Sequence, residues 1–183
     1  MKHLLLFMLL VSGFASHAQT ETGNFLVGGN LQLTAAKDNF DIQLNPTAGY
    51  FFVDNFAAGL NLDLGYSKNG ALSSAFKTTT LGIGPFVRFY TGTATVRPFL
   101  DGDVNFASVK YGYNTDSRTY TGLKFFVGPG AAIFLNRNVA IEGLAGYEHA
   151  AYKNQLGSGG FTFKVGFQAY LNRTQVKAAT NTP

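Results

Sequence analysis

The sequence predicts an all-β fold, an eight-stranded antiparallel up-and-down transmembrane β-barrel. The clearest strand runs from Gly160 to Leu171, where apolar residues alternate with polar or small ones. Ordinary strands have roughly 5–6 residues, whereas roughly 9–11 are needed to cross a bilayer at a tilt, and this segment has the longer length. Because unpaired backbone groups are costly in hydrocarbon, a strand of this kind must belong to a closed sheet.

The composition supports a membrane protein. Charged residues make up 13% of the 183 residues, aromatic residues make up 15%, and there are 22 glycines. Soluble domains have about 25% charged residues. The chain has no Cys, which excludes disulfides, thiolate nucleophiles and Cys-ligated metals. The net charge of +4 forms no basic stripe, so we expect no nucleic-acid partner.

The first 18 residues have the pattern of a cleaved secretory signal peptide. Lys2 and His3 precede an apolar run at 4–11, and the small-x-small sequence at 16–18 is typical of a cleavage site. The apolar run is too short for a transmembrane helix. We therefore expect a signal peptide at 1–18, a barrel at 19–171 and a periplasmic C-terminal tail at 172–183. An exported chain with amphipathic strands indicates the outer membrane of a Gram-negative cell.

The first three predicted strands are bounded by turn signals and alternate with period two. In the third strand, Leu62 and Leu64 alternate with Asn61 and Asp63 almost perfectly. A tight turn at 53–55 precedes it, because Asp and Asn tolerate turn dihedrals. The predicted bounds of these strands are Asn24–Ala35, Ile42–Phe52 and Phe56–Ser67.

The remaining five strands show the same alternation but include prolines. Pro85, Pro98 and Pro129 fall within strands, where each removes a ladder hydrogen bond, so we expect bulges or strand ends there. The predicted bounds are Lys77–Tyr90, Val96–Val109, Tyr120–Leu135, Val139–His149 and Gly160–Leu171.

The links between strands alternate in length. Short turns are predicted at 53–55, 91–95 and 136–138, and longer polar segments at Lys68–Phe76, Lys110–Thr119 and Ala150–Gly159. This alternation is typical of a transmembrane barrel with short periplasmic turns and longer outer loops. An even number of strands then places both ends of the barrel in the periplasm. A further alternative is a soluble secreted barrel that binds an apolar ligand, in which the apolar side chains would face the interior and the polar ones the solvent.

Aromatic residues gather near strand ends, which predicts two belts at the membrane interfaces. The periplasmic belt would comprise Tyr50, Phe51, Phe52, Phe56, Phe89, Tyr90, Phe134 and Tyr170. The outer belt would comprise Tyr66, Phe106, Tyr111, Tyr120, Tyr147 and Phe161.

Charged residues share the polar parity of their strands, so they are predicted to face the lumen. An eight-stranded barrel is just wide enough to be filled by side chains, and buried charges must be paired. We expect a stack of ion pairs with Arg88, Arg97 and Glu142 near the periplasmic end, then Asp63, Asp101, Asp103 and Lys164, and finally Lys124 and Glu148 near the outer mouth.

The chain resembles the small eight-stranded outer-membrane β-barrel proteins, the group that includes outer-membrane proteins A and X. The last strand ends V-G-F-Q-A-Y-L, which is similar to the assembly signal of that family, here Gly166, Phe167, Ala169, Tyr170 and Leu171. The resemblance implies contact with outer-membrane lipid, lipopolysaccharide and the barrel assembly machinery. It does not extend to the peptidoglycan-binding domain of outer-membrane protein A.

Two function classes remain open, and neither involves a cofactor or metal. One is a monomeric structural or surface-interaction barrel whose outer segments contact a partner. The other is a narrow pore or small-ligand transporter, as the resemblance to outer-membrane protein A suggests. Catalysis is not expected, because the only His after the signal peptide, His149, lacks the H-x-S pattern of barrel deacylases.

Overall fold

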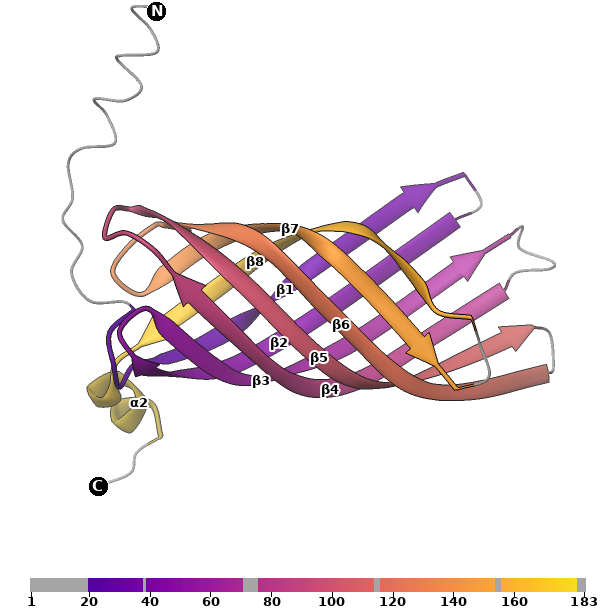
Figure 1. Cartoon of the computed structure of the whole chain (residues 1–183), viewed down its shortest axis with the longest axis horizontal. Coiled ribbons are helices and arrows are strands. Elements are labelled where there is room, and N and C mark those ends of the chain that lie inside the picture. The colour runs from indigo at the N-terminus through magenta and orange to yellow at the C-terminus, as the bar shows by residue number, and fades with distance from the viewer. Residues whose placement is uncertain (1–19, 38, 71–75, 114–115, 154–155, 181–183) are drawn as a thin grey trace, which may run out of the picture.

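The computed structural model describes residues 20–37, 39–70, 76–113, 116–153 and 156–180; the predicted signal peptide lies outside them. The described residues form eight long, tilted strands and a short helix at one end (Figure 1). The elements are β1 (Phe25–Ala36), β2 (Asn39–Val53), β3 (Phe56–Asn69), β4 (Phe76–Tyr90), β5 (Val96–Tyr113), β6 (Asp116–Phe134), β7 (Val139–Tyr152), β8 (Ser158–Leu171) and α2 (Arg173–Thr180).

The eight strands form one closed barrel in the order β1 to β8. Each strand is antiparallel to the next, and β1 pairs with β8 in a register that runs from Phe25–Leu171 to Leu31–Val165. Closure supplies partners for backbone groups that would otherwise be unpaired in hydrocarbon. The predicted fold class is confirmed. No helix among the described residues has the length and apolar character needed to cross a membrane.

At the end of the barrel that carries the chain termini, the strand bounds match the prediction. At the opposite end of the barrel they differ. β5 continues to Tyr113 and β6 begins at Asp116, so most of the predicted loop Lys110–Thr119 is strand. Similarly, β7 ends at Tyr152 and β8 begins at Ser158. The prediction of long loops was wrong for these two links, because polarity marks where the chain leaves hydrocarbon, whereas pairing with the adjacent strand determines its conformation. Most of the third predicted link, Lys68–Phe76, lies outside the described residues.

The two faces of the barrel wall have opposite polarity, as the alternation predicts. On the outer face Leu81 is 61% exposed and Val165 is 62% exposed. On the inner face Asp63 and Arg88 are each 1% exposed. The apolar face therefore looks towards lipid and the polar face towards the lumen.

The prolines lie within unshifted ladders. Pro85 pairs in register with Leu60 of β3, while the β4–β5 ladder skips it without a change of register. Pro129 pairs with Leu100 of β5, and the ladder to β7 skips it in the same way. The prediction of a bulge at these two sites was wrong, because a missing N–H removes pairing on one side only. Pro98 lies near the start of β5, in agreement with the prediction.

Both aromatic belts agree with the prediction only in part. Tyr111 and Tyr120, which were assigned to the outer belt, have the inward-facing parity of Asp101 on β5 and Lys124 on β6. Phe106 and Phe161 are exposed on the outer face at one end, and Phe52 and Phe89 at the other. However, four residues assigned to the periplasmic belt are buried inside the barrel: Phe51, Tyr90, Phe134 and Tyr170. That assignment was wrong because it considered distance from a turn and ignored side-chain alternation.

Helix α2 follows β8 and is joined to the end of the barrel by hydrogen bonds. Asn172 caps it, with Oδ1 accepting from the Gln175 backbone N–H at 2.9 Å, and the Gln175 side chain accepts from the Asn172 N–H at 3.0 Å. Gln175 also accepts a hydrogen bond from Asn138 at 3.0 Å, and Arg173 donates to the Tyr50 hydroxyl at 2.9 Å. The segment 172–180 is therefore attached to the barrel base.

The segment before β1 also packs across the barrel base. The Asn55 N–H donates to the Thr20 carbonyl at 2.7 Å, and the Thr22 N–H donates to Asp54 Oδ1 at 2.8 Å. The Thr22 hydroxyl donates to the same oxygen at 2.7 Å. The hydrogen bond from the Thr22 backbone N–H, and to a smaller extent that from the Thr22 hydroxyl, holds the pKa of the Asp54 carboxyl below its usual range.

Candidate functional site

All nine charged residues predicted for the lumen lie on the inner face of the wall. Seven of them are at most 8% exposed, and Asp103 and Glu148 are partly exposed. Alternation along each strand places them there, and pairing between strands sets their heights. The seven most buried residues are Asp63, Arg88, Arg97, Asp101, Lys124, Glu142 and Lys164.

The first cluster, the inner network, comprises Arg88, Asp101, Glu142, Tyr90 and Tyr170. Arg88 Nε lies 2.8 Å from Asp101 Oδ1, and its Nη1 lies 2.7 Å from Glu142 Oε2. The Tyr170 hydroxyl donates to Glu142 Oε1 at 2.7 Å and lies 2.9 Å from the Tyr90 hydroxyl. Arg88 Nη1 also donates to the Tyr90 oxygen at 3.2 Å.

Aromatic rings enclose the inner network. The Arg88 guanidinium lies 4.5 Å from the Phe99 ring centroid, and the Arg88 side chain is 1% exposed. The Phe134 and Tyr170 ring centroids are 4.8 Å apart. A planar guanidinium that binds two carboxylates between rings has one favourable geometry, so this level of the barrel is held rigidly.

Arg97 lies closer to the barrel base and outside the inner network. Its Nη1 donates to the Thr20 hydroxyl, which donates to Asn55 Oδ1 at 2.6 Å. Its guanidinium lies 5.2 Å from the Phe134 ring centroid. Thr20 is 3% exposed, so the segment before β1 covers the lumen at this end.

The second cluster, the outer network, comprises Lys124, Asp63, Glu148 and Lys164. Lys124 Nζ lies 2.7 Å from Asp63 Oδ2 and 3.4 Å from Glu148 Oε1. Lys164 Nζ lies 3.3 Å from Glu148 Oε2 and 4.0 Å from the Phe126 ring centroid. Asp63 Oδ1 also accepts from Gln43 at 2.7 Å and from Asn45 at 3.3 Å.

A small polar cavity of about 10 Å³ lies between the two networks. Asn45, Thr47, Asn61 and Asp103 are among the residues that line it. Within the described part of the chain, the buried amide oxygens of Asn30, Asn45 and Asn61 have no protein hydrogen-bond partner. A cavity of this size has room for about one water molecule, which would satisfy some of these oxygens.

The predicted height of Asp101 was wrong. It was expected near the middle of the lumen with Asp63, but it lies directly opposite Arg88 in the inner network, whereas Asp63 pairs with Lys124 in the outer network. Counting residues from the turns ignores the tilt and stagger of the strands, which set the heights in a barrel.

Sequence reasoning missed the buried hydroxyls that complete the site. Tyr90 and Tyr170 were assigned to a lipid-facing belt, and Thr20 received no role. The signal was present, because Tyr90 has the parity of Arg88 in β4 and Tyr170 has the parity of Lys164 in β8. The contact of Thr20 with the base depends on tertiary packing and has no periodic signal.

The residues of the predicted assembly signal lie on the closing seam. Gly166 is opposite Asn30, Ala169 is opposite Val27, and Leu171 is opposite Phe25. Phe167 is 55% exposed towards lipid, whereas Tyr170 is 1% exposed in the lumen. Their role in assembly stays a prediction.

His149 does not form a catalytic pair with its neighbour Glu148. Its ring lies on the outward face, with centroids 5.3 Å from Phe125 and 6.4 Å from Tyr147. Glu148 points inward to Lys124 and Lys164. In the residues that the structure describes, no group of three or more His, Asp or Glu side chains could hold a metal ion.

Comparison with solved structures finds other barrels. Neisserial surface protein A from Neisseria has a TM-score of 0.52 at 16% identity, covering 80% of this chain and 93% of that chain. A major outer membrane protein from Thermus thermophilus has a TM-score of 0.51 at 14% identity, covering 81% of this chain and 98% of that chain. At these identities the likeness concerns the fold alone.

No curated protein matches the chain in sequence. The family model described as the outer membrane protein beta-barrel domain matches residues 4–168, which is most of the chain. The chain therefore belongs to the outer membrane protein β-barrel family.

Proposed function

We propose that this protein is a non-conducting outer-membrane barrel with a structural or surface-interaction role and without catalytic activity. The inner network carries the proposal. Arg88 is bound to two carboxylates across the lumen, at 2.8 and 2.7 Å, and is 1% exposed. A side chain held in this way occupies the path that a permeating ion would need.

The energetics favour a closed state. Moving Arg88 aside would leave Asp101 and Glu142 buried without their cation, and breaking a buried ion pair in this way costs about 3–5 kcal/mol. Such a cost corresponds to an open fraction on the order of 1% or less. The Phe99 and Tyr90 rings beside Arg88 leave little room for water to replace it.

The location and partners belong to the same proposal. The lipid-facing apolar wall supports insertion in the outer membrane of a Gram-negative cell, with lipid and lipopolysaccharide around it. Delivery would use the signal peptide at 1–18 and the barrel assembly machinery, which would bind the end of β8. We expect a monomer.

Planar-bilayer recording of the purified, folded protein tests the proposal. We expect no discrete conductance steps above the background of the bilayer. An open porin recorded in the same bilayer is the positive control. Stepwise currents from this protein at modest voltage would contradict a closed lumen.

A narrow path for water or a very small solute is the second candidate. The observation that favours it is the cavity of about 10 Å³ with partnerless amide oxygens between the networks. The outer network is also more open, since the Glu148 side chain is 24% exposed. Stopped-flow swelling of proteoliposomes would separate water permeation from ion conduction.

A further inference from the structure

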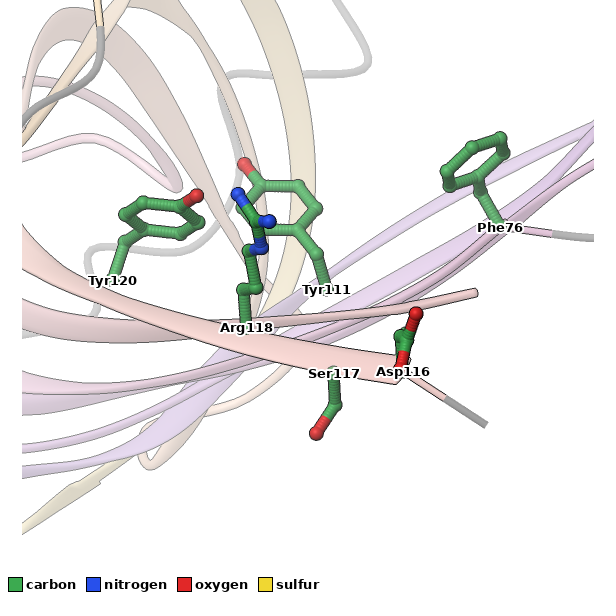
Figure 2. Close-up of a pocket in the computed structure, with 7 residues that line it drawn as sticks. Phe76, Tyr111, Asp116, Ser117, Arg118 and Tyr120 are labelled. Atoms are coloured by element: carbon green, nitrogen blue, oxygen red, sulfur yellow. The ribbon is translucent and has the colours of Figure 1, made fainter. Parts of the chain in front are cut away.

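The outer end of the barrel carries a second site, on the projecting part of β4, β5 and β6. There a cavity of about 430 Å³, which we name the outer cup, is lined by Phe76, Tyr111, Gly112, Asp116, Ser117, Arg118 and Tyr120. Figure 2 shows Tyr111, Arg118 and Tyr120 on one side of the β5–β6 hairpin and Ser117 on the other. This volume falls within the roughly 300–1,000 Å³ of small-molecule sites.

The polarity of the wall is reversed at this height. Along β5 the inner parity continues from Asp101 and Asn105 to Val109 and Tyr111, so the lumen-facing side becomes aromatic. The opposite parity, which is apolar in the membrane, becomes Ser108 and Lys110 on β5 and Ser117, Thr119 and Thr121 on β6. Lipid contact cannot explain aromatic residues on the lumen-facing side of the wall.

The hairpin itself positions these side chains. Tyr111 lies directly opposite Arg118 in the β5–β6 ladder, and Tyr120 lies opposite Val109. The Tyr111 and Tyr120 ring centroids are 5.8 Å apart at an interplanar angle of 69°. Strand pairing therefore holds two phenolic rings at a steep angle beside a guanidinium, with the Asp116 carboxylate at the same inner parity.

We propose that the outer cup binds a pyranose-type saccharide from the surroundings of the cell. The proposal deepens the surface-interaction function proposed above and rests on it. Tyrosine rings provide flat apolar faces with polar edges, which suit the C–H face and the hydroxyls of a sugar ring. Arg118 supplies paired N–H donors and Asp116 supplies acceptors, so both kinds of hydroxyl contact are available.

The facing of the cup selects the source of the saccharide. Lipopolysaccharide of the same membrane approaches the barrel from its sides, where Lys110, Thr119 and Thr121 form a face without aromatic rings. The rings of the cup face the barrel axis, so its ligand enters from above. A peptide added to the β6 edge would instead contact backbone groups and would not need the rings.

The test is a titration of the ¹⁵N-labelled barrel in bicelles, followed by amide chemical shifts. The probes are maltotriose, chitotriose and a trigalacturonate, with the delipidated core oligosaccharide of lipopolysaccharide and a Thr/Val-rich hexapeptide as competing ligands. We expect at least one trisaccharide to shift the amides of Tyr111, Arg118 and Tyr120 in a saturable manner. Arg118→Ala and Tyr120→Ala should each weaken binding by about tenfold or more.

Matched variants on the other face of the same hairpin control for indirect effects. Lys110→Ala and Thr119→Ala should leave binding unchanged, and the SDS heat-modifiable mobility of all variants should match that of the unmodified protein. No shift with any trisaccharide would overturn the proposal. The proposal would also be overturned if the core oligosaccharide bound most strongly. The same holds if the hexapeptide bound most strongly and shifted the amides along the β6 edge. The two proposals can fail separately. If no saccharide binds but no current steps are recorded, the proposed non-conducting barrel stands. Current steps would contradict the non-conducting barrel whether or not a saccharide binds.

Discussion

The inner and outer networks of the lumen both pair cations with carboxylates, but they differ in geometry and exposure. In the inner network, a guanidinium binds two carboxylates at 2.8 and 2.7 Å, and the Asp101 and Glu142 side chains are at most 6% exposed. In the outer network, two ammonium groups share Glu148 at 3.4 and 3.3 Å, and that carboxylate is 24% exposed. The planar Arg88 guanidinium fixes the direction of its partners, whereas a lysine ammonium is a compact point charge on a flexible stem.

The difference indicates which network would form the barrier in the proposed closed lumen. Two tyrosine hydroxyls and the Phe99 ring complete the inner network, which leaves Arg88 1% exposed. The outer network is more accessible to solvent, since the Glu148 side chain is 24% exposed. We infer that the inner network is the barrier and that the outer network sets the charge of the mouth.

The largest expected effect comes from Arg88→Met. This change leaves Asp101 and Glu142 buried without a cation and should lower the free energy of unfolding by about 3–5 kcal/mol. The matched Lys124→Met leaves Asp63 with hydrogen bonds from Gln43 and Asn45, so we expect about 1–3 kcal/mol. Urea unfolding in lipid vesicles measures both. An equal or larger loss for Lys124→Met would contradict the ranking of the two networks.

A smaller effect is expected from Tyr170→Phe. It removes the hydroxyl that donates to Glu142 and contacts Tyr90, and should reduce the free energy of unfolding by about 1–2 kcal/mol. Tyr147→Phe, on the lipid-facing side, is the control and should change little. If the same unfolding assay gave no difference between these variants, Tyr170 would be only a ring that fills space.

The outer mouth should be more tolerant. Glu148→Gln removes a partly exposed charge from two lysines and should change the free energy of unfolding by about 1 kcal/mol or less. Lys124 retains Asp63 at 2.7 Å in this variant. A loss as large as that of Arg88→Met would show that the outer network is as closely built as the inner one.

The smallest effect lies outside both networks, at the barrel base. Because hydrogen bonds from Thr22 lower the pKa of Asp54, this contact contributes stability above the unfolded pKa of about 3.9 and loses it as pH falls through the lower folded pKa. The Thr22 amide shift should therefore titrate with a midpoint below about 3.9. Asp54→Asn should abolish the titration, and a midpoint at or above that value would contradict the assignment.

The sequence was sufficient for the strands and for the inward facing of the charges. Strict alternation places Asp63 and Lys164 on the inner face whatever the neighbouring strands do. The bounds at the outer end were not predictable, because residues 110–113 and 116–119 are polar yet remain paired with each other.

Partners within the lumen were less accessible to sequence reasoning. The contact between Arg88 and Glu142 joins residues 54 positions apart, and its existence depends on barrel stagger. Tyr170 was misplaced because its position at the end of a strand received more weight than its parity. The prediction of bulges at Pro85 and Pro129 was wrong for a related reason, since only the structure shows on which side of the strand the ladder hydrogen bond is missing.

Side-specific labelling of a cysteine between the two networks tests the closed lumen most directly. The chain has no Cys, so Thr47→Cys, which lines the small cavity, introduces a unique thiol, and Ser117→Cys on the outer hairpin is the exposed control. In proteoliposomes treated with a charged methanethiosulfonate reagent from either side, the account predicts rapid labelling at 117 and none at 47. Labelling at 47 from the periplasmic side, at a rate near that of the control, would contradict a barrier at the inner network.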